Sequence, residues 1–467
     1  MTTENRRKEE AKTEESGRNP VLPLNSAMVD ETKREESLLP DNQRYIPIPK
    51  IEGVVSDYNI QEATKAVIRN KGAPGIDSIT TEEIEGILQK EWPKIKQEIL
   101  DGKYRPSPVR RVEIPKPDKN GVRKLGIPTV MDRIIQQAIY QELMFTFEAI
   151  FSENSYGFRR SRNAQQAVLK AQGYIQEGYE WVVDMDLEKF FDKVNHDILM
   201  AKVARRIKDK KILLLIRRYL QAGVLENGLV KPSEEGTPQG GPLSPLLSNI
   251  MLDDFDKELE RRGLRFVRYA DDCNIYVKTE IAGQRVMKSA IKYLTTRLKL
   301  KVNEEKSAVA HPWERKFLGF TFKKEEPGKI AIHESRIKRL KDKIRGLTKK
   351  MRDGNLTVSI RKFIMPIVRG WTNYFGIAEE QGIFASLDGW IRRKIRGIQW
   401  RQWKEPRTRF KKLKSLGIKE QTARNHGYSS KGPWKMARSH VMHKVFSNST
   451  IESMGYIPMA KLVCARS

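Results

Sequence analysis

Cysteine is scarce in this sequence, with two in 467 residues. Cys273 and Cys464 lie far apart, so neither a disulfide framework nor a cysteine-based zinc site can be built from them. Apolar runs of the roughly 18 to 20 residues that a membrane span requires are also missing. The N-terminal stretch "MTTENRRKEEAKTEESGRNP" lacks the apolar core of a secretory signal. These absences predict a cytoplasmic protein with no membrane partner.

Acidic residues are few relative to basic ones: 59 Asp and Glu stand against 88 Lys and Arg, which gives a formal charge of +29. An excess of this size predicts a polyanionic partner, most often nucleic acid. A ribosome-associated or merely basic protein is the alternative. The hydrophobic content of 39% is sufficient for a packed core, and the length allows two to four domains.

Composition and periodicity divide the chain into four parts. Residues 1–45 are charged and poor in aromatics, which predicts a flexible tail. Residues 46–330 alternate helical and strand-like patterns, which favours an α+β body. Three amphipathic segments in 331–403 predict a small helical bundle. Residues 404–467 form a basic C-terminal region.

Two acidic clusters interrupt strand-like runs. The stretch "LRFVRYADDCNIYV" places Asp271 and Asp272 among β-branched and aromatic residues, where adjacent carboxylates repel each other unless a basic side chain or a divalent metal offsets them. Upstream, "WVVDMD" reads as a strand with Asp184 and Asp186 on one face and Asp186 near its end. A strand end and a hairpin tip could jointly hold two divalent ions about 3.5 to 4 Å apart. Each cluster alone also fits a strand-end cap or a solvated turn.

Several ordered blocks resemble the reverse transcriptases encoded by group II introns. The blocks include "RRVEIPKPDKNGVRKLGIPT", "SYGFRRSRNAQQAV", "DLEKFFD", "EEGTPQGGPLSPLLSNIMLDDFDKEL", "YADD", "KFLGFTF", "RGWTNYFG" and "GWIRRKIRGIQWRQWK". The compact bacterial class without an endonuclease domain is the most similar. The resemblance implies a right-hand polymerase fold: fingers and palm over 46–330, a helical thumb (maturase domain) over 331–403, and a small basic DNA-binding region over 404–467.

The resemblance also assigns the acidic residues. It implies that Asp186, Asp271 and Asp272 are the catalytic carboxylates and that they hold two Mg²⁺ ions, with Mn²⁺ as an alternative. The backbone carbonyl of Leu187 is expected to help hold the nucleotide-bound metal. Asp184 fits the catalytic position of the family less well and receives no catalytic role.

Three cations are expected at the triphosphate of a bound deoxynucleotide. Lys116 and Arg123 flank the turn signal "PDKNG", so a hairpin could fold both over the phosphates. By resemblance, Lys306 also approaches the active-site phosphates. Two solvated hairpin charges are the alternative for Lys116 and Arg123.

Other nucleotide contacts are implied by resemblance alone. Phe191 occupies the position where the family places a bulky side chain under the sugar, which selects deoxynucleotides. Ordinary helix packing is the alternative for either Phe190 or Phe191. Gln239 in "GTPQGGPLSP" resembles the nucleotide-contacting glutamine of the family, and Gly240 its close-packing neighbour.

Cations and tryptophans alternate after residue 389. Ile391, Ile395 and Ile398 form a candidate core stripe, which leaves the cations for phosphate contacts and the tryptophans for base stacking. Wholly buried tryptophans are the alternative. The cations expected to bind nucleic acid are Arg392, Arg393, Arg396, Arg401, Lys404 and Arg407.

Taken together, the resemblance implies an RNA-directed DNA polymerase that binds group II intron RNA, promotes its splicing and copies it at a DNA target. Its partners would be intron RNA, an RNA template with a DNA or RNA primer, target DNA and deoxynucleotides. The chain has no CxxC pairs of an HNH nuclease, so we expect no cleavage of the second DNA strand. A domesticated reverse transcriptase in phage defence or spacer acquisition, and a non-catalytic RNA-binding splicing factor, are the alternatives.

Overall fold

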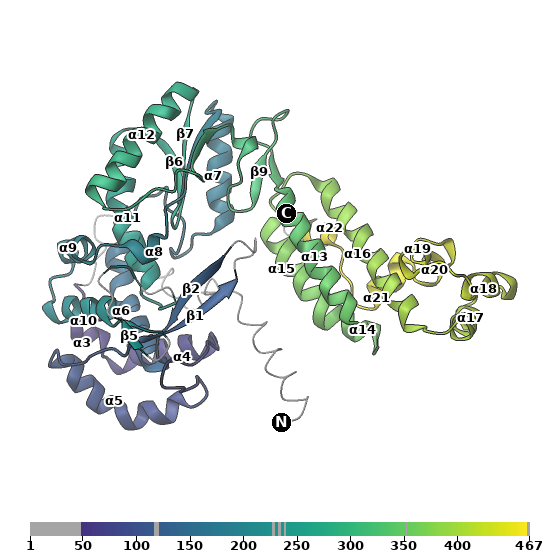
Figure 1. Cartoon of the computed structure of the whole chain (residues 1–467), viewed down its shortest axis with the longest axis horizontal. Helices are drawn as coiled ribbons and strands as arrows, with labels where there is room; N and C mark the ends of the chain where they lie inside the picture. Colours follow the sequence, from purple (N-terminus) through teal and green to yellow (C-terminus); the bar gives the residue numbers. More distant parts are fainter. Residues whose placement is uncertain are drawn as a thin grey trace, which may run out of the picture. The chain divides into compact units, whose positions relative to one another are not determined.

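The computed structural model describes residues 48–115, 121–226, 229–231, 235–237, 240–351 and 353–464. These residues form two compact units (Figure 1). The first contains the residues up to 171 and residues 179–310, and the second contains residues 172–178 and those from 311 onward. The expected tail over 1–45 lies outside the described residues, and the expected domain boundaries at 330/331 and 403/404 stay predictions.

Several helices of the first unit begin at polar residues that suit helix starts. Ser56, Thr129, Asp209 and Thr279 each precede a helix and accept a hydrogen bond from a backbone N–H of its first turn, which satisfies a donor that the helix itself leaves free. The helices are α3 (Ile51–Val54), α4 (Asp57–Arg69), α5 (Ile84–Leu100), α6 (Val130–Glu148), α8 (Phe190–Lys193), α9 (His196–Arg206), α10 (Lys210–Gln221), α11 (Ser244–Arg261), α12 (Glu280–Arg297) and α7 (Ala164–Gln176), which continues into the second unit.

An antiparallel sheet forms the centre of the first unit. Among the described residues its strand order is β6-β7-β3-β8, and the strands are β3 (Trp181–Met185), β6 (Arg265–Tyr269), β7 (Asp272–Val277) and β8 (Ala308–Ala310). In the register of the central pair, Trp181 lies opposite Val277 and Met185 opposite Cys273. The end of β3 therefore lies beside the start of β7, where the two acidic clusters of the sequence meet.

A second sheet lies in the same unit and carries the "PDKNG" hairpin. Its strands run in the order β2-β1-β4-β5, with bounds Val122–Ile127, Val109–Pro115, Val224–Glu226 and Leu229–Lys231. β1 and β2 pair antiparallel, with Ile114 opposite Arg123. The structure thus confirms strands on both sides of the predicted turn, while residues 116–120 lie outside the described residues.

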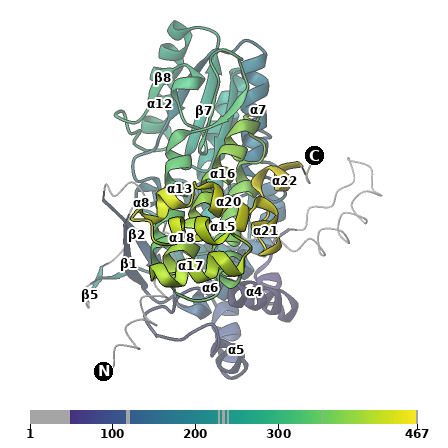
Figure 2. The ribbon, with the colours of Figure 1, turned by 90° about the vertical axis from the view of Figure 1, so that its right-hand side faces the viewer.

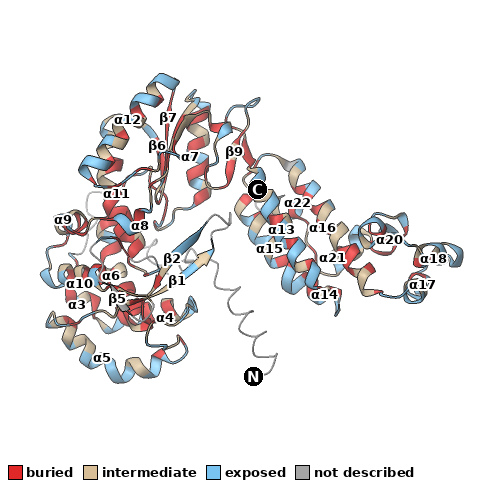
Figure 3. Cartoon of the chain, in the orientation of Figure 1, coloured by how far each residue is buried: buried red, intermediate tan, exposed pale blue. Residues whose placement is uncertain are grey.

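One hydrophobic core joins the central sheet to the helices of the first unit. α12 contacts β3, β7 and β8, and α11 contacts β6. Figure 3 shows buried residues concentrated along α6, α11 and the central strands, whereas α5 is largely exposed or half-buried. The core extends from Ile51 at the start of the unit to Val302 beyond α12.

The second unit begins with a short hairpin and continues as helices. The hairpin pairs β9 (Phe320–Phe322) with β10 (Ile330–Ile332). Figure 2 shows α17 and α18, which contact each other, toward the viewer. The helical segments are α13 (Glu334–Lys350), α14 (Leu356–Ser359), the π-helical turn η3 (Ile360–Ile364), α15 (Met365–Phe375), α16 (Gln381–Gln402), α17 (Pro406–Ser415), α18 (Glu420–Gly427), α19 (Pro433–Met436), α20 (His440–Val445), α21 (Asn448–Ser453) and α22 (Met459–Cys464).

Helix α16 is the centre of the second unit. Ile391, Ile395 and Ile398 are fully buried, which confirms the predicted core stripe. The Asp388 carboxylate, 2% exposed, accepts hydrogen bonds from the hydroxyl of Tyr456 and from the amide of Met459 at 2.9 Å. A buried side chain of α16 therefore fixes a segment about 70 residues later in the chain.

A mixed α/β body followed by helices confirms the predicted α+β class. No helix in the described part of the chain is long and apolar enough to cross a membrane.

Candidate active site

The turn between β6 and β7 explains the paired aspartates of "YADD". Tyr269 and Asp272 form the last cross-strand pair, so Ala270 and Asp271 make a two-residue turn. Ala270 adopts a positive φ of 58°, as the first central residue of a type II′ turn does. Asp271 therefore lies at the hairpin tip, whereas Asp272 is the first residue of β7 and its side chain is exposed.

The structure brings Asp186 and Asp271 together. Asp186 directly follows β3, whose end lies beside the start of β7. Burial raises the pKa of the Asp271 carboxyl above its usual value, and the nearby charge of Asp186 raises it further. Two carboxylates that repel each other at the end of a sheet create a negative potential that a cation would relieve.

Asp186 is held on both sides by the segment that follows α12. Its amide donates to the hydroxyl of Ser307 at 3.0 Å, and its carbonyl accepts from the amide of Asn303 at 2.8 Å. Nζ of Lys306 lies 3.5 Å from the Asp186 carboxylate. The structure thus places Lys306 beside the Asp186 carboxylate, while its expected contact with the phosphates stays a prediction. It also adds Ser307 and Asn303, which the sequence interpretation did not single out.

The oxygen atoms at this site suit a hard cation that takes its remaining ligands from water and from the substrate. Among the described residues, no three His, Cys, Asp or Glu side chains gather closely enough to hold a metal ion by themselves. Leu187 forms an antiparallel bridge with Val302. The two backbone hydrogen bonds of this bridge run from the Glu188 amide to the Lys301 carbonyl and from the Asn303 amide to the Asp186 carbonyl, so neither uses the Leu187 carbonyl. Mg²⁺ is commonly bound by one or two carboxylates together with water and substrate phosphates, and Asp186, Asp271 and the Leu187 carbonyl fit that pattern.

A buried ion pair supports the hairpin tip. Arg268 of β6 is 1% exposed and Asp256 of α11 is fully buried, and the guanidinium donates to both carboxylate oxygens. The same guanidinium donates to Oδ1 of Asn249 at 3.0 Å and to the carbonyl of Ala270 at 2.9 Å. Burial raises the pKa of Asp256, and the charge of Arg268 opposes that shift. This network fixes the residue directly before Asp271.

The sequence interpretation missed this network, although it contains one usable signal. Alternation along β6 puts Arg268 on the same face as the buried Phe266. A cation on a core face requires a buried partner. The partner itself could not be named, because Asp256 is one of several acidic residues in "LDDFDKELE".

The two aromatic residues after Asp186 differ in burial. Phe190 is 2% exposed and belongs to the core, whereas Phe191 is half-buried and packs edge-on against it, with ring centroids 5.2 Å apart. The carbonyl of Phe191 accepts from the amide of Thr237 at 2.6 Å. The core-packing alternative thus describes Phe190, and Phe191 keeps an accessible surface.

The glycine-rich segment contacts the strand that carries Arg123. Gly240 has a φ of 129°, and a Cβ atom there would lie 2.6 Å from the carbonyl oxygen of Gly126 in β2. Arg123 itself is exposed, and its charge lowers the pKa of Asp271, which places it within electrostatic reach of the carboxylates. The predicted contacts Lys116 and Gln239 lie outside the described residues.

Three of the predicted nucleic-acid-binding arginines are bonded within the second unit. Arg393 donates to the carbonyl of Trp434 and lies 3.7 Å from the centre of its ring. Arg401 donates to the carbonyl of Thr348 at 2.7 Å. Arg396 is 3% exposed and donates to the carbonyl of Phe446 and to Asn448. A guanidinium so enclosed has no free face for a phosphate, so the nucleic-acid surface proposed below omits Arg396.

The remaining predicted cations are more accessible. Lys404 and Arg407 are exposed, and Lys404 pairs with Asp353 at 3.0 Å on the surface. Arg392 is half-buried. The tryptophans divide in the same way: Trp400 and Trp403 are core residues, whereas Trp390 is half-buried.

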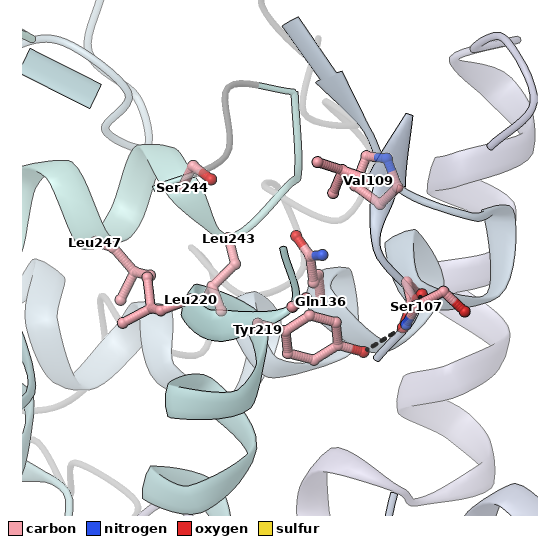
Figure 4. Close-up of a pocket in the computed structure, with 11 residues that line it drawn as sticks. Ser107, Val109, Gln136, Tyr219, Leu220, Leu243, Ser244 and Leu247 are labelled. Carbon is pink, nitrogen blue, oxygen red and sulfur yellow. Dashed lines mark hydrogen bonds between the residues drawn. The ribbon is translucent and has the colours of Figure 1, made fainter. Parts of the chain in front are cut away.

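A small cavity with a mainly apolar lining lies apart from the carboxylates, between α6, α10 and α11 (Figure 4). Its volume of about 20 Å³ is enough for one water molecule. Asp132 at its wall accepts from the hydroxyls of Tyr104, Tyr219 and Thr129, and burial raises its pKa. The polar wall of the cavity is thus satisfied by hydrogen bonds within the core, and none of the lining residues is one of the predicted site residues.

The buried pair predicts unequal costs for two kinds of replacement. Asp256→Asn should lower the free energy of unfolding by about 3 to 5 kcal/mol, because it leaves the Arg268 charge buried without its partner. The double replacement Arg268→Met with Asp256→Leu should cost less, because no charge remains. Urea denaturation measures both. Glu258→Gln in the exposed Arg261–Glu258 pair is the control and should change stability by less than about 1 kcal/mol. A cost for Asp256→Asn no larger than the control would contradict the assignment.

Comparison with known proteins agrees with this geometry. Residues 114–322 match the reverse transcriptase (RNA-dependent DNA polymerase) family, and residues 337–417 match the maturase-specific domain of group II introns. Protein YkfC of Escherichia coli K12 is 34% identical over 293 residues, a match that covers 54% of this chain and 76% of YkfC. Group II intron-encoded protein LtrA of Lactococcus lactis subsp. cremoris is 36% identical over 247 residues, 53% of this chain and 40% of LtrA.

A telomerase structure from Candida albicans, in complex with the TWJ fragment of telomeric RNA, shares 13% identity over 84% of this chain and 72% of that chain, with a TM-score of 0.43. A likeness this weak adds nothing to the assignment, which the sequence matches carry. A reverse transcriptase depends on a divalent metal and acts on nucleic acid, and the maturase-specific domain adds RNA binding. The chain belongs to the reverse transcriptase/maturase family encoded by group II introns.

Proposed function

We propose that this chain adds deoxynucleotides to a primer along an RNA template at Asp186 and Asp271, and that it binds its group II intron RNA, promotes its splicing and copies it at a DNA target. The convergence of Asp186 and Asp271 in a chain that carries both family domains is the observation that supports this most. A purely RNA-binding splicing factor would gain nothing from two carboxylates that repel each other.

The proposed metal content is two Mg²⁺ ions, with Mn²⁺ as a substitute. When bound, such ions lower the pKa of an attacking 3′-hydroxyl and offset charge on the leaving pyrophosphate. Asp186, Asp271, Asp272 and the Leu187 carbonyl would hold them, and Asp272 is the most exposed of the three carboxylates. The support is the donor chemistry: oxygen ligands only, at the ends of two adjacent strands.

Different residues of the described chain are proposed to contact the triphosphate, the sugar and the base of the incoming nucleotide. Arg123 and Lys306 are exposed cations beside the carboxylates, suited to the triphosphate. Phe191 would lie under the sugar and exclude a 2′-hydroxyl. Gly240 would let the backbone come close to the incoming base pair, with Gln239 and Lys116 as further contacts.

The proposed nucleic-acid surface of the second unit comprises the exposed cations of α17 and its approach, together with Arg392, the half-buried Arg401 and the exposed parts of Arg393 and Trp434. Trp434 is 41% exposed, and Arg393 and Lys394 both lie over its ring. Lys404 and Arg407 begin a run of exposed cations that continues with Lys411, Lys412 and Lys414. Phosphate contacts require such cations, and their number governs the salt dependence of binding.

Replacing Asp271 should separate the metal site from the fold. In EDTA, Asp271→Asn should melt about 2 to 4 °C higher than the wild type, because it removes a charge that burial and Asp186 both disfavour. Mg²⁺ or Mn²⁺ should raise the melting temperature of the wild type and not of the variant, since only the former binds the ion well. Differential scanning fluorimetry measures both. Asp197→Asn, at an exposed position, is the control, and an equal Mg²⁺ response in Asp271→Asn would refute the ligand assignment.

Copying and RNA binding should respond to different replacements. Asp271→Asn should lose at least about 100-fold in primer extension on an RNA template while keeping intron RNA affinity and splicing stimulation, because binding depends on basic surface rather than on the metal. The triple change Lys404→Gln, Arg407→Gln and Lys411→Gln should weaken RNA binding and lower the magnitude of its salt slope by about 2 to 3.

A matched triple change on α12 controls for charge alone. Arg285, Lys288 and Lys292 are exposed there, and their replacement with Gln removes the same charge. RNA affinity and salt slope should stay closer to the wild type in this variant. Loss of splicing in Asp271→Asn with RNA affinity intact would show that both activities use the carboxylates.

The difference in burial between Phe190 and Phe191 predicts which of them selects the sugar. Phe191→Val should reduce the preference for deoxynucleotides over ribonucleotides by about tenfold or more, because the bulk under the 2′ position is lost. Phe190→Val should instead lower stability through a core cavity. The ratio of kcat/KM values for the two nucleotides is the measurement. Relaxed selection in Phe190→Val alone would reverse the assignment.

A further inference from the structure

The loop "SYGFRRSRN", residues 155–163, precedes α7 and has no role so far. We infer that Phe158 in this loop is a contact for the template–primer duplex at the active site, an inference that rests on the polymerase function proposed above. Phe158 would present its ring to the sugars of the duplex, or to the unpaired template base at its end, beside the hairpin that carries Asp271. It would act as a binding residue and take no part in the chemistry.

Phe158 combines an exposed ring with an unfavourable backbone. Its φ is 58°, in the left-handed region that bulky L-residues avoid, and its side chain is 45% exposed. Ser161, three residues later, also has a positive φ of 56°. A large apolar side chain in a strained conformation on the surface gives little to the stability of the fold, so its presence calls for a function.

The loop is fixed strongly enough to maintain this strain. Arg159, 7% exposed, donates to the Glu148 carboxylate at 2.9 Å and to the carbonyls of Ser152 and Ser155. Arg162 donates to the carbonyl of Glu153 at 2.6 Å and to its carboxylate. Both arginines bind the preceding turn of chain, Arg159 from a buried position and Arg162 at the surface. Phe158 directly precedes Arg159, the first of these two bonded arginines, and directly follows Gly157, which contacts the active-site hairpin. Its backbone conformation is therefore set by its surroundings.

The loop also contacts the active-site hairpin directly. Residues 154–156 run beside β6, where the amide of Tyr156 donates to the carbonyl of Arg268 at 2.8 Å. A Cβ atom at Gly157 would lie 2.2 Å from the amide nitrogen of Ala270, so only glycine permits this approach. Asn249, which also binds Arg268, donates to the carbonyl of Gly157 at 2.8 Å. Phe158 thus directly follows Gly157, whose backbone contacts the Ala270–Asp271 turn.

The chemistry of this position favours nucleic acid as the occupant. The 3′-end of a primer must reach Asp186 and Asp271 for the proposed reaction, so the terminal base pairs pass beside the Ala270–Asp271 turn. At the end of the duplex the next template base is unpaired, and an exposed aromatic ring can stack on any unpaired base, which suits an enzyme that copies every sequence. A protein partner on this face would block the entry of the duplex.

The test is the affinity for a fluorescein-labelled RNA template annealed to a DNA primer, measured by anisotropy without nucleotide. Phe158→Gly removes the ring and fits the positive φ, so the fold is retained. Phe158→Leu keeps the bulk without the aromatic face, and Phe158→Tyr keeps the ring. Phe158→Gly and Phe158→Leu should raise Kd by about 5- to 100-fold, whereas Phe158→Tyr should stay within about twofold of the wild type.

Other measurements exclude a merely structural role. The melting temperature of Phe158→Gly should not fall, and kcat at saturating duplex should change far less than KM for the duplex. Tyr58→Ala, which removes a 65% exposed aromatic ring from α4, should leave Kd unchanged. Wild-type affinity in Phe158→Gly or Phe158→Leu overturns the inference, as does a loss in Phe158→Tyr as large as that in Phe158→Gly. Absence of primer extension by the wild type would refute the proposed function instead.

Discussion

The active site depends on one buried ion pair, Arg268 with Asp256. Its guanidinium binds the carboxylate, the Asn249 amide and the Ala270 carbonyl, so a single side chain connects α11, β6 and the hairpin tip. Desolvating two charges is costly, and a buried pair seldom adds much net stability. What it supplies here is geometry. The turn that carries Asp271 is tied to a helix that is itself packed against the sheet.

The sheet order makes this anchoring useful. Because β3 lies between β7 and β8, Asp186 at its end is enclosed by the hairpin on one side and by the Asn303–Ser307 segment on the other. Three stretches far apart in sequence thus converge on one edge of the sheet. The carboxylates can differ in their surroundings, with Asp271 more buried and Asp186 beside Lys306, while the distance between them is held by backbone hydrogen bonds.

Local patterns in the sequence predicted those features that depend on local structure. The strand-like run around "YADD" predicted the hairpin, and the change from the strand pattern of "WVVDMD" to a helical pattern placed Asp186 near a strand end. The isoleucine spacing identified the buried stripe of α16. Features that depend on distant contacts escaped prediction. The partner of Arg268 lies 12 residues away on another element, and Arg396 is enclosed by carbonyl and amide groups about 50 residues later. Helical periodicity cannot show which polar residues a later segment will cover.

Buried side chains of helix α16 form their hydrogen bonds with residues that lie much later in the sequence and are synthesised later. Asp388 needs the hydroxyl of Tyr456 and the amide of Met459, and Arg396 needs the carbonyl of Phe446, which lie 50 to 71 residues further on. During translation, therefore, the helix emerges with a carboxylate and a guanidinium that have no partners at its future core. A nascent chain that stops before about residue 460 cannot complete this unit, whereas the sheet bearing the carboxylates closes once residue 310 has emerged. The order of synthesis thus makes the polymerase body available before the helical unit is complete.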